Sequence, residues 1–158
     1  MIATPGLAWI SQVESLCQGR GLHMTALRRE IVGIFAEADQ PLGAYAIIQK
    51  LSEVQNRIVA PPTVYRTLDF LVENGFVVKI ESRQAYIACD HLGHDHDHHH
   101  HGIVLSCVKC GRSAEVESAA VEKEVAAIAA GRCFKVERKV FEIDGICAEC
   151  SGVSSSAL

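Results

Sequence analysis

Two pairs of cysteines in the second half of the chain have the spacing of metal ligands. The pairs are Cys107-Val-Lys-Cys110 and Cys147-Ala-Glu-Cys150. Thiolates in two CxxC pairs bind zinc tetrahedrally and leave no open coordination position, so such a site is structural rather than catalytic. The 36 residues between the pairs exceed the ~15–20 of a simple zinc ribbon. A folded element must therefore lie between the pairs and bring them together.

A histidine-rich run precedes the first pair. Residues 90–101 read DHLGHDHDHHHH and directly follow Cys89. Imidazoles bind zinc, copper and nickel, so this run reacts with metal whatever else it does. Two simpler interpretations are an expression tag, although the run is internal and interrupted by acids, and a loop that buffers metal without specificity. Cys89 is either a ligand or a buried strand residue, and its ionisable neighbours favour a ligand.

The composition indicates a globular protein whose halves differ in chemistry. The chain has 158 residues, of which 49% are hydrophobic and 22% charged; this excludes wholesale disorder and fits one domain or two small ones. There is no apolar run of the ~20 residues that span a bilayer and no signal peptide in residues 1–9, so we expect a cytoplasmic protein with reduced thiols. Residues 1–88 contain 8 basic and 8 acidic residues and residues 89–158 contain 7 and 11, so the net charge of −4 comes from the second half.

The first half is predicted to be a winged helix-turn-helix. Apolar residues recur at helical spacing over residues 9–17, 27–38 and 44–54, with Thr25 suited to cap the second helix and Val54 expected to face inward. A fourth helix starts at residue 61 with two prolines in its first turn and runs to the stop signal Asn74-Gly75. Residues 76–80 and 85–89 then have the composition of two strands joined by a short turn.

The exposed face of the fourth helix carries hydroxyl groups and one arginine. Recognition helices of this fold contact DNA bases near their N-terminal ends. An arginine can bond a guanine edge through two hydrogen bonds, and hydroxyl-bearing side chains can contact phosphates or thymine methyls. The simpler interpretation of Arg66 is a solvated surface residue, and periodicity alone does not decide between the two. The candidate DNA-contacting residues are Tyr45, Thr63, Tyr65, Arg66 and Thr67.

The second half is predicted to be a small α+β unit closed by one zinc ion. Strands are expected at residues 103–105 and 114–116, a helix from Ser118 to Gly131, and a long strand with one bulge over residues 134–143. This order brings the two cysteine pairs to one four-cysteine site, and in so small a core zinc binding is part of folding. The two remaining cysteines, Cys17 and Cys133, are expected to be buried packing residues.

These motifs together resemble the ferric uptake regulator family of dimeric, metal-responsive bacterial repressors. The resemblance rests on Pro61-Pro62-Thr63-Val64-Tyr65-Arg66-Thr67-Leu68, on Gly75-Phe76-Val77, on the histidine-rich run and on the two CxxC pairs, and it covers about residues 10–150. It implies an α+β fold in four parts. These are a winged-helix DNA-binding domain (1–88), a hinge loop (89–102), a dimerisation and metal-binding domain (103–150) and a disordered tail (151–158).

Within this family the sequence is most similar to the zinc uptake regulators. The resemblance implies a regulatory zinc held by Cys89, His100 and Glu115, in addition to the structural zinc. A thiolate ligand agrees with zinc, since iron and manganese sensors favour nitrogen and oxygen ligands. Many zinc sensors take a fourth ligand from the first wing strand, where this chain has Val78. Either His91 or His98 replaces that ligand, or water completes the site.

A second site known in iron-responsive members uses histidines of the loop and a glutamate of the following helix. Glu122 lies at the corresponding position in this chain. Whether this chain uses such a site is left open by the sequence.

The resemblance implies a repressor and not an enzyme. A zinc-loaded homodimer would bind palindromic operator DNA and repress zinc-uptake genes, with no membrane or small-molecule substrate as partner. Since the expected regulatory ligands lie at the end of the first domain, in the hinge and in the second domain, zinc that joins them would fix the angle between the domains. In a dimer that angle sets the spacing of the two recognition helices.

Three other functions fit parts of the sequence. An iron- or peroxide-responsive regulator of the same family would not depend on Cys89. A zinc storage or delivery protein would use the histidine-rich run but leaves the recognition-helix motif unexplained. A zinc hydrolase needs an open zinc position and a general base, and the sequence contains no HExxH framework.

Overall fold

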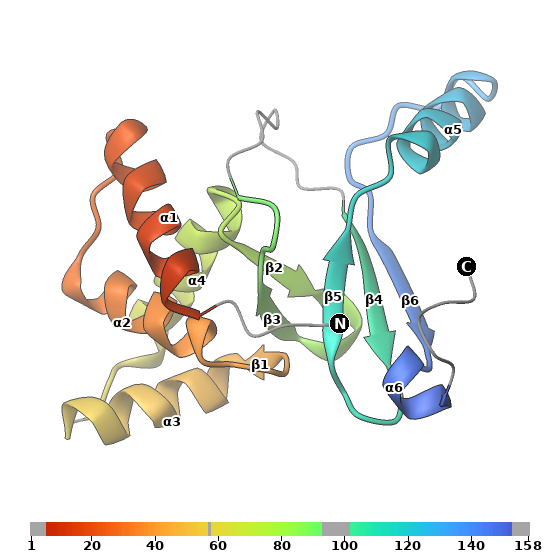
Figure 1. Ribbon diagram of the computed structural model, residues 1–158. Helices are drawn as coiled ribbons and strands as arrows, with labels where there is room; N and C mark the ends of the chain where they lie inside the picture. Colours follow the sequence, from red (N-terminus) through yellow and green to blue (C-terminus); the bar gives the residue numbers. More distant parts are fainter. Residues whose placement is uncertain (1–5, 57, 93–101, 153–158) are drawn as a thin grey trace. The chain divides into compact units, whose positions relative to one another are not determined.

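The computed structural model describes residues 6–56, 58–92 and 102–152 (Figure 1). The chain divides into two compact units, residues 1–99 and residues 100–158, and each is described by itself. No helix in the described ranges is long and apolar enough to cross a membrane. Residues 93–101 of the predicted hinge, which include His98 and His100, and residues 153–158 of the predicted tail lie outside the described residues.

Helices build most of the first unit, and local sequence signals set their ends. The Thr25 side chain accepts a hydrogen bond from the Arg28 amide and so caps the second helix, as predicted. Pro61 begins the fourth helix, where a missing amide hydrogen costs nothing, and Asn74 ends it. The helices are α1 (Gly6–Gly19), α2 (Ala26–Ala36), α3 (Ala44–Gln55) and α4 (Pro61–Glu73).

One apolar core joins these helices. Ile31 and Phe35 of α2, Ile47 and Leu51 of α3 and the inner face of α4 are fully or almost fully buried in it. The prediction that Val54 faces inward is wrong: it is 74% exposed. Val54 lies in the last turn of α3, close to the end of the helix at Gln55. This end of the helix extends beyond the apolar core.

The wing is a three-stranded sheet rather than the two-stranded hairpin predicted. Strands β2 (Val77–Ile80) and β3 (Ala85–Ala88) pair antiparallel around the one-turn helix η1 (Glu81–Arg83). The two-residue strand β1 (Leu42–Gly43) pairs with the other edge of β3, so the order is β1-β3-β2. So short a strand has no alternation of apolar and polar residues by which to recognise it.

The second unit is a small α+β fold, which confirms the predicted fold class. Its antiparallel pair β4–β5 surrounds the first cysteine pair, and β6 returns parallel to β4, giving the order β5-β4-β6. Of the long strand predicted over residues 134–143, only the end is confirmed, because β6 begins at Phe141 and residues 134–140 form no regular structure. The elements are β4 (Ile103–Cys107), β5 (Ser113–Val116), α5 (Ala119–Ala130), β6 (Phe141–Gly145) and α6 (Ala148–Ser151).

Helix α5 has no fully buried side chain, although Val121, Val125 and Ala129 are partly buried. Its cap is as predicted, since Ser118 accepts a hydrogen bond from the Val121 amide. Ile128 on this helix and Phe134 and Val140 after it are nevertheless largely exposed. An apolar surface of this kind is typical of a face that another chain covers.

Candidate metal centre

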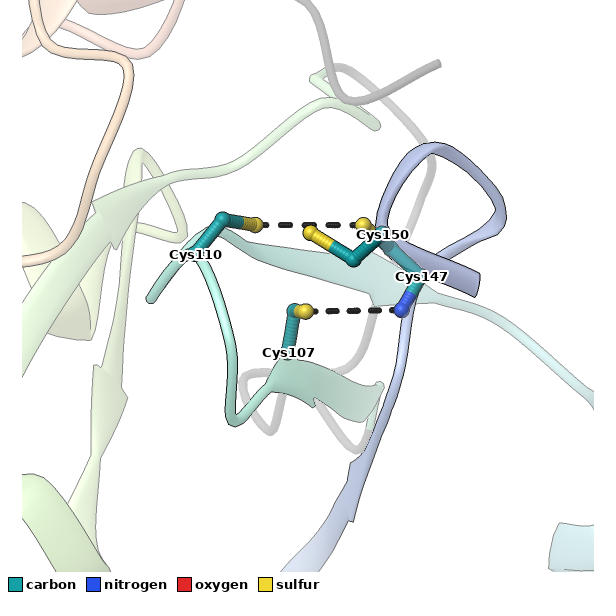
Figure 2. A group of neighbouring side chains, drawn as sticks. All are labelled: Cys107, Cys110, Cys147 and Cys150. Atoms are coloured by element: carbon teal, nitrogen blue, oxygen red, sulfur yellow. Dashed lines mark hydrogen bonds between the residues drawn. The ribbon is translucent and has the colours of Figure 1, made fainter. Parts of the chain in front are cut away.

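The four cysteines of the two CxxC pairs converge on one point (Figure 2). Cys107 ends β4, Cys110 lies in the turn after it, and Cys147 and Cys150 stand before and within α6. The four sulfur atoms all lie within 4.8 Å of one another, and Cys110 Sγ is 3.8 Å from Cys147 Sγ. Four thiolates around one zinc ion, at Zn–S distances of about 2.3 Å, have their sulfur atoms about 3.8 Å apart. The donor set therefore fits tetrahedral zinc.

Strand pairing brings the two cysteine pairs together across residues 111–146. Because β6 runs parallel to β4, Cys107 pairs with Gly145, and Cys147 follows two residues later. The Val108 amide donates to the Gly145 carbonyl at 2.9 Å, and the Cys147 amide donates to Cys107 Sγ at 3.4 Å. The folded insert that the spacing required is therefore β5, α5 and β6.

Hydrogen bonds shift the pKa values of the cysteine thiols in opposite directions. The Cys147 amide lowers the pKa of Cys107 to about 5, and a hydrogen bond from the Arg112 side chain lowers the pKa of Cys110. A hydrogen bond shared with Cys147, together with burial, raises the pKa of Cys150 to about 12. Cys107 thus favours thiolate at neutral pH, whereas Cys150 must release a proton when a metal binds.

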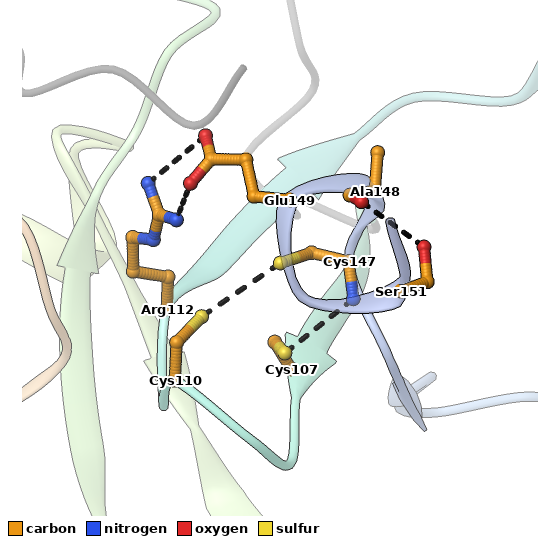
Figure 3. Close-up of polar contacts among 7 residues, drawn as sticks. All are labelled: Cys107, Cys110, Arg112, Cys147, Ala148, Glu149 and Ser151. Carbon is orange, nitrogen blue, oxygen red and sulfur yellow. Dashed lines mark hydrogen bonds and ion pairs between the residues drawn. The ribbon is translucent and has the colours of Figure 1, made fainter. Parts of the chain in front are cut away.

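Two basic side chains, Arg112 and Lys109, tie the first cysteine pair to the second, and Figure 3 shows the contact of Arg112. The Arg112 guanidinium forms a two-pronged ion pair with Glu149, with Nη1 3.3 Å from Oε1. The backbone carbonyl of Arg112 also accepts the Cys107 amide at 2.9 Å. Lys109 Nζ donates to the Cys150 carbonyl at 3.3 Å. Arg112 therefore contacts the first pair through its backbone and its hydrogen bond to Cys110, and its side chain also contacts the helix of the second pair.

Glu115, a predicted regulatory ligand, lies on β5 opposite Val104 and is 4% exposed. Gly102 leaves the room for its side chain, because a Cβ atom on Gly102 would overlap Glu115 Oε1. Ser106 and Ser113 are buried on the same face of the sheet, with their hydroxyl oxygens 2.7 Å apart. The carboxylate is thus packed beside the residue at which the described chain resumes.

Cys89, a second described candidate for the regulatory site, directly follows β3 and is fully buried. Its amide donates to the Phe76 carbonyl at 3.0 Å, and its carbonyl accepts the Trp9 indole N–H at 2.8 Å. His91 follows, half-buried. Cys89 belongs to the first unit and Glu115 to the second, and His100 and His98 lie outside the described residues. The regulatory ligand set therefore stays a prediction.

The predicted DNA-contacting residues are exposed, with one exception. Arg66, Thr63 and Tyr65 lie on the exposed side of α4, and Tyr45 at the start of α3 is 79% exposed. Thr67 is 6% exposed and its hydroxyl donates to the Thr63 carbonyl at 3.1 Å. Its hydroxyl is therefore engaged within the helix, and Thr67 is withdrawn from the set.

The remaining cysteines differ from each other. Cys17 is buried, as predicted, and burial raises the pKa of its thiol. The prediction for Cys133 is wrong: it is exposed, in a left-handed conformation with φ 53° shortly after α5. Because α5 has no fully buried side chain, the turn that follows it does not lead into a core.

Sequence reasoning missed the residues that support the ligands. Arg112 and Glu149 are 37 positions apart, and Trp9 and Cys89 are 80 apart. No local pattern marks such pairs. The glycine that directly follows the histidine-rich run was visible in the sequence, but only the packing of Glu115 against Gly102 gives it a reason.

Comparison with known proteins agrees with this architecture. Residues 19–144 match the model of the ferric uptake regulator family. The chain belongs to that family. It is 35% identical over 146 residues to the zinc uptake regulation protein of Escherichia coli (strain K12), covering 92% of this chain and 83% of that protein.

Two solved structures resemble this family member over nearly its whole length. A zinc uptake regulator complexed with zinc and DNA is 34% identical, covers 92% of this chain and 95% of its own, and superposes with a TM-score of 0.83. The crystal structure of holo XcZur is 35% identical, covers 92% and 98%, and superposes with a TM-score of 0.81.

The link between the two cysteine pairs makes a testable prediction. Arg112→Ala removes the contact to Glu149, and outer-shell changes of this kind weaken metal binding by about 10-fold or more. We expect zinc to pass from the variant to a colorimetric chelator about tenfold faster than from the wild type. Since the two side chains form one pair, Arg112→Ala/Glu149→Ala should be no faster than the single variant. Lys123→Ala, an exposed change on α5, is the control, and equal rates for Arg112→Ala and wild type would contradict the role.

The close approach of Gly102 to Glu115 makes a second testable prediction. In Gly102→Ala the new methyl group overlaps the Glu115 side chain, and overpacking a buried site costs about 1–3 kcal/mol. We expect that loss in the free energy of unfolding, measured by denaturant titration. In Gly131→Ala the nearest atom is 3.4 Å away, so this control should lose less. Gly102→Ala/Glu115→Ala should recover stability relative to Gly102→Ala, and a further loss would refute the overlap.

Proposed function

We propose that this protein is a zinc-responsive repressor of zinc-uptake genes that binds operator DNA as a zinc-loaded homodimer, and that it acts in the cytoplasm as a regulator rather than an enzyme. The observation that carries the proposal is the match along 92% of the chain to a zinc uptake regulator complexed with zinc and DNA. The four-cysteine cluster supports the zinc dependence, since its sulfur atoms fit zinc.

One zinc ion per subunit would be structural. Cys107, Cys110, Cys147 and Cys150 would hold it, and no position would remain open for a substrate. Bound there, zinc supplies the cross-link that holds β4 and α6 together. Loss of any of the four thiolates should therefore cost the second unit its structure.

A second zinc ion would be regulatory. We assign Cys89, His100 and Glu115 as its ligands, with His91 or His98, or a water molecule, in the place that Val78 cannot fill. Burial supports two of these residues as prepared donors: Cys89 is fully buried with its backbone hydrogen-bonded, and Glu115 is held at β5 in the space left by Gly102. Thiolate, imidazole and carboxylate together suit zinc.

The regulatory step would be a shift between two populations of domain arrangements. Ligands that come from both units can all be used only in an arrangement that brings the units together correctly. Moving such an equilibrium from about 1:99 to 99:1 requires a preference of ~5.5 kcal/mol for the competent form. Metal–ligand bonds made in that form alone can supply a preference of this size.

DNA contact would be made by α4 and the start of α3. Arg66 is the candidate for reading a guanine edge in the major groove, since its guanidinium can donate two hydrogen bonds. Tyr45, Thr63 and Tyr65 are exposed around it and would contact phosphates or thymine methyls. This set follows from exposure and chemistry together.

The second copy would cover the apolar surface of the second unit. Leu105 of β4 pairs in register with Ile143 of β6, and both side chains are exposed. Ile128 of α5 and Phe134 after it are further exposed apolar side chains of the same unit. A two-fold dimer formed through it would present two recognition helices to a palindromic operator.

Zinc titration of DNA binding tests the proposed function. The purified protein is mixed with promoter fragments of zinc-importer genes in a metal buffer at fixed salt, and zinc content is counted in parallel. The wild type should retain one tight zinc ion and bind DNA as a second is taken up. Cys89→Ser should fold and keep one zinc ion but fail to switch, because a regulatory ligand is lost.

Arg66→Ala is the matched control for that titration. It should take up both zinc ions yet bind DNA more weakly by about 1–3 kcal/mol, the value of one arginine–guanine contact. If no DNA fragment is bound at any zinc concentration while metal is still taken up, the protein is a zinc store or carrier instead. If Cys89→Ser switches like the wild type, the metal is sensed elsewhere.

The proposed dimer surface makes a further prediction. Ile143→Glu places a charge in the apolar surface, so we expect light scattering to give the mass of one chain for the variant and of two for the wild type. Leu7→Glu is the control, since Leu7 is an exposed apolar residue of α1 in the first unit. An unchanged mass for Ile143→Glu would place the dimer contact elsewhere.

A further inference from the structure

The side chain of the only tryptophan in the chain is hydrogen-bonded to the backbone of Cys89. Trp9 lies on α1, is 4% exposed, and donates its indole N–H to the Cys89 carbonyl at 2.8 Å. These residues are 80 positions apart, so α1 reaches across the first unit to the end of the wing. The Trp9 side chain therefore links the first helix to the peptide of this proposed ligand.

Both polar groups of the Cys89 backbone are held. The amide is bound to the Phe76 carbonyl, and the carbonyl is bound to Trp9. Phe76 is fully buried, and β3 pairs with β2 directly before Cys89, through Ala88 and Val77. The peptide that carries the sulfur atom is thus fixed from two sides by groups that themselves cannot move freely.

The chain that follows Cys89 also lies next to α1. Leu92 packs against the core of the first unit and lines a shallow groove together with Ser11, Gln12, Ser15 and Leu16 of α1. Helix α1 therefore holds the start of the hinge at two points, through the Trp9 hydrogen bond and through Leu92.

We propose that Trp9 is a positioning residue of the regulatory zinc site, a role that rests on the proposed function of Cys89 as a ligand. A zinc site requires its ligand atoms near fixed distances, and residues that orient a ligand are worth about 10- to 100-fold in metal affinity. The Trp9 hydrogen bond restrains the Cys89 backbone before metal arrives, so less freedom is lost when the ligands assemble. The other role of such a bond is only to satisfy a buried carbonyl group.

Trp9→Phe separates these two roles. Phenylalanine keeps an aromatic ring in the core but removes the N–H donor. We expect the variant to retain the structural zinc and to bind the second zinc ion about tenfold more weakly, measured by competition with a fluorescent chelator. The zinc concentration at which DNA binding switches on should rise by the same factor.

A second core variant controls for lost stability. Ile47→Val trims a fully buried side chain of α3 and lowers the melting temperature without touching Cys89. It should bind the second zinc ion as the wild type does. If Trp9→Phe also binds that zinc with wild-type affinity, or if Ile47→Val is weakened equally, the bond only satisfies the carbonyl and the positioning role is refuted.

The wild-type protein provides a readout that needs no folded variant. Because Trp9 is the only tryptophan and is bonded to the Cys89 peptide, its fluorescence should change as the second zinc ion binds and stay constant as the first does. Constant emission through both steps would refute the role if Trp9→Phe does not fold. Cys89→Ser distinguishes the two proposals: if it keeps the second zinc ion, Cys89 is not a ligand and the proposed regulatory site itself is wrong.

Discussion

The parallel pairing of β6 with β4 is the contact on which the second unit depends. It sets Gly145 beside Cys107, so that α6 delivers Cys147 and Cys150 to the first cysteine pair. Everything inserted between the pairs must therefore return the chain in the same direction in which it left. Strand β5 first carries the chain back antiparallel to β4, and α5 follows before β6 begins, so β5 and α5 together form the connection between the parallel strands β4 and β6. The four-cysteine site can therefore form only in a sheet in which β6 pairs parallel with β4.

The proposed sensing function places a different demand on the first unit. The recognition helix must be exposed along one side, whereas the proposed ligand Cys89 must be rigid and buried. Helix α4 meets the first demand with one buried face and one polar face. The second is met by α1, whose Trp9 reaches the end of the wing. One small core thus supports both the surface that would touch DNA and the residue that would respond to metal.

Much of this was predictable from sequence, for physical reasons that also explain the failures. Helical periodicity, the caps at Thr25 and Ser118 and the two cysteine pairs are local signals, and each led to the right element. Val54 and Cys133 were misplaced because burial depends on what lies opposite, which periodicity does not report. The contacts of Arg112 and Trp9 join distant positions and leave no pattern in a single sequence.

The exposed surface of α5 has a consequence for how stability must be described. A helix without a fully buried side chain must obtain much of its apolar stabilisation from association. Under the proposed dimerisation, mass action then governs that part of the fold, and the melting temperature should rise with protein concentration. Newly made chains at low abundance would sit closer to the unfolded state than the same chains once accumulated. The concentration of this protein would therefore contribute to the stability of each folded chain.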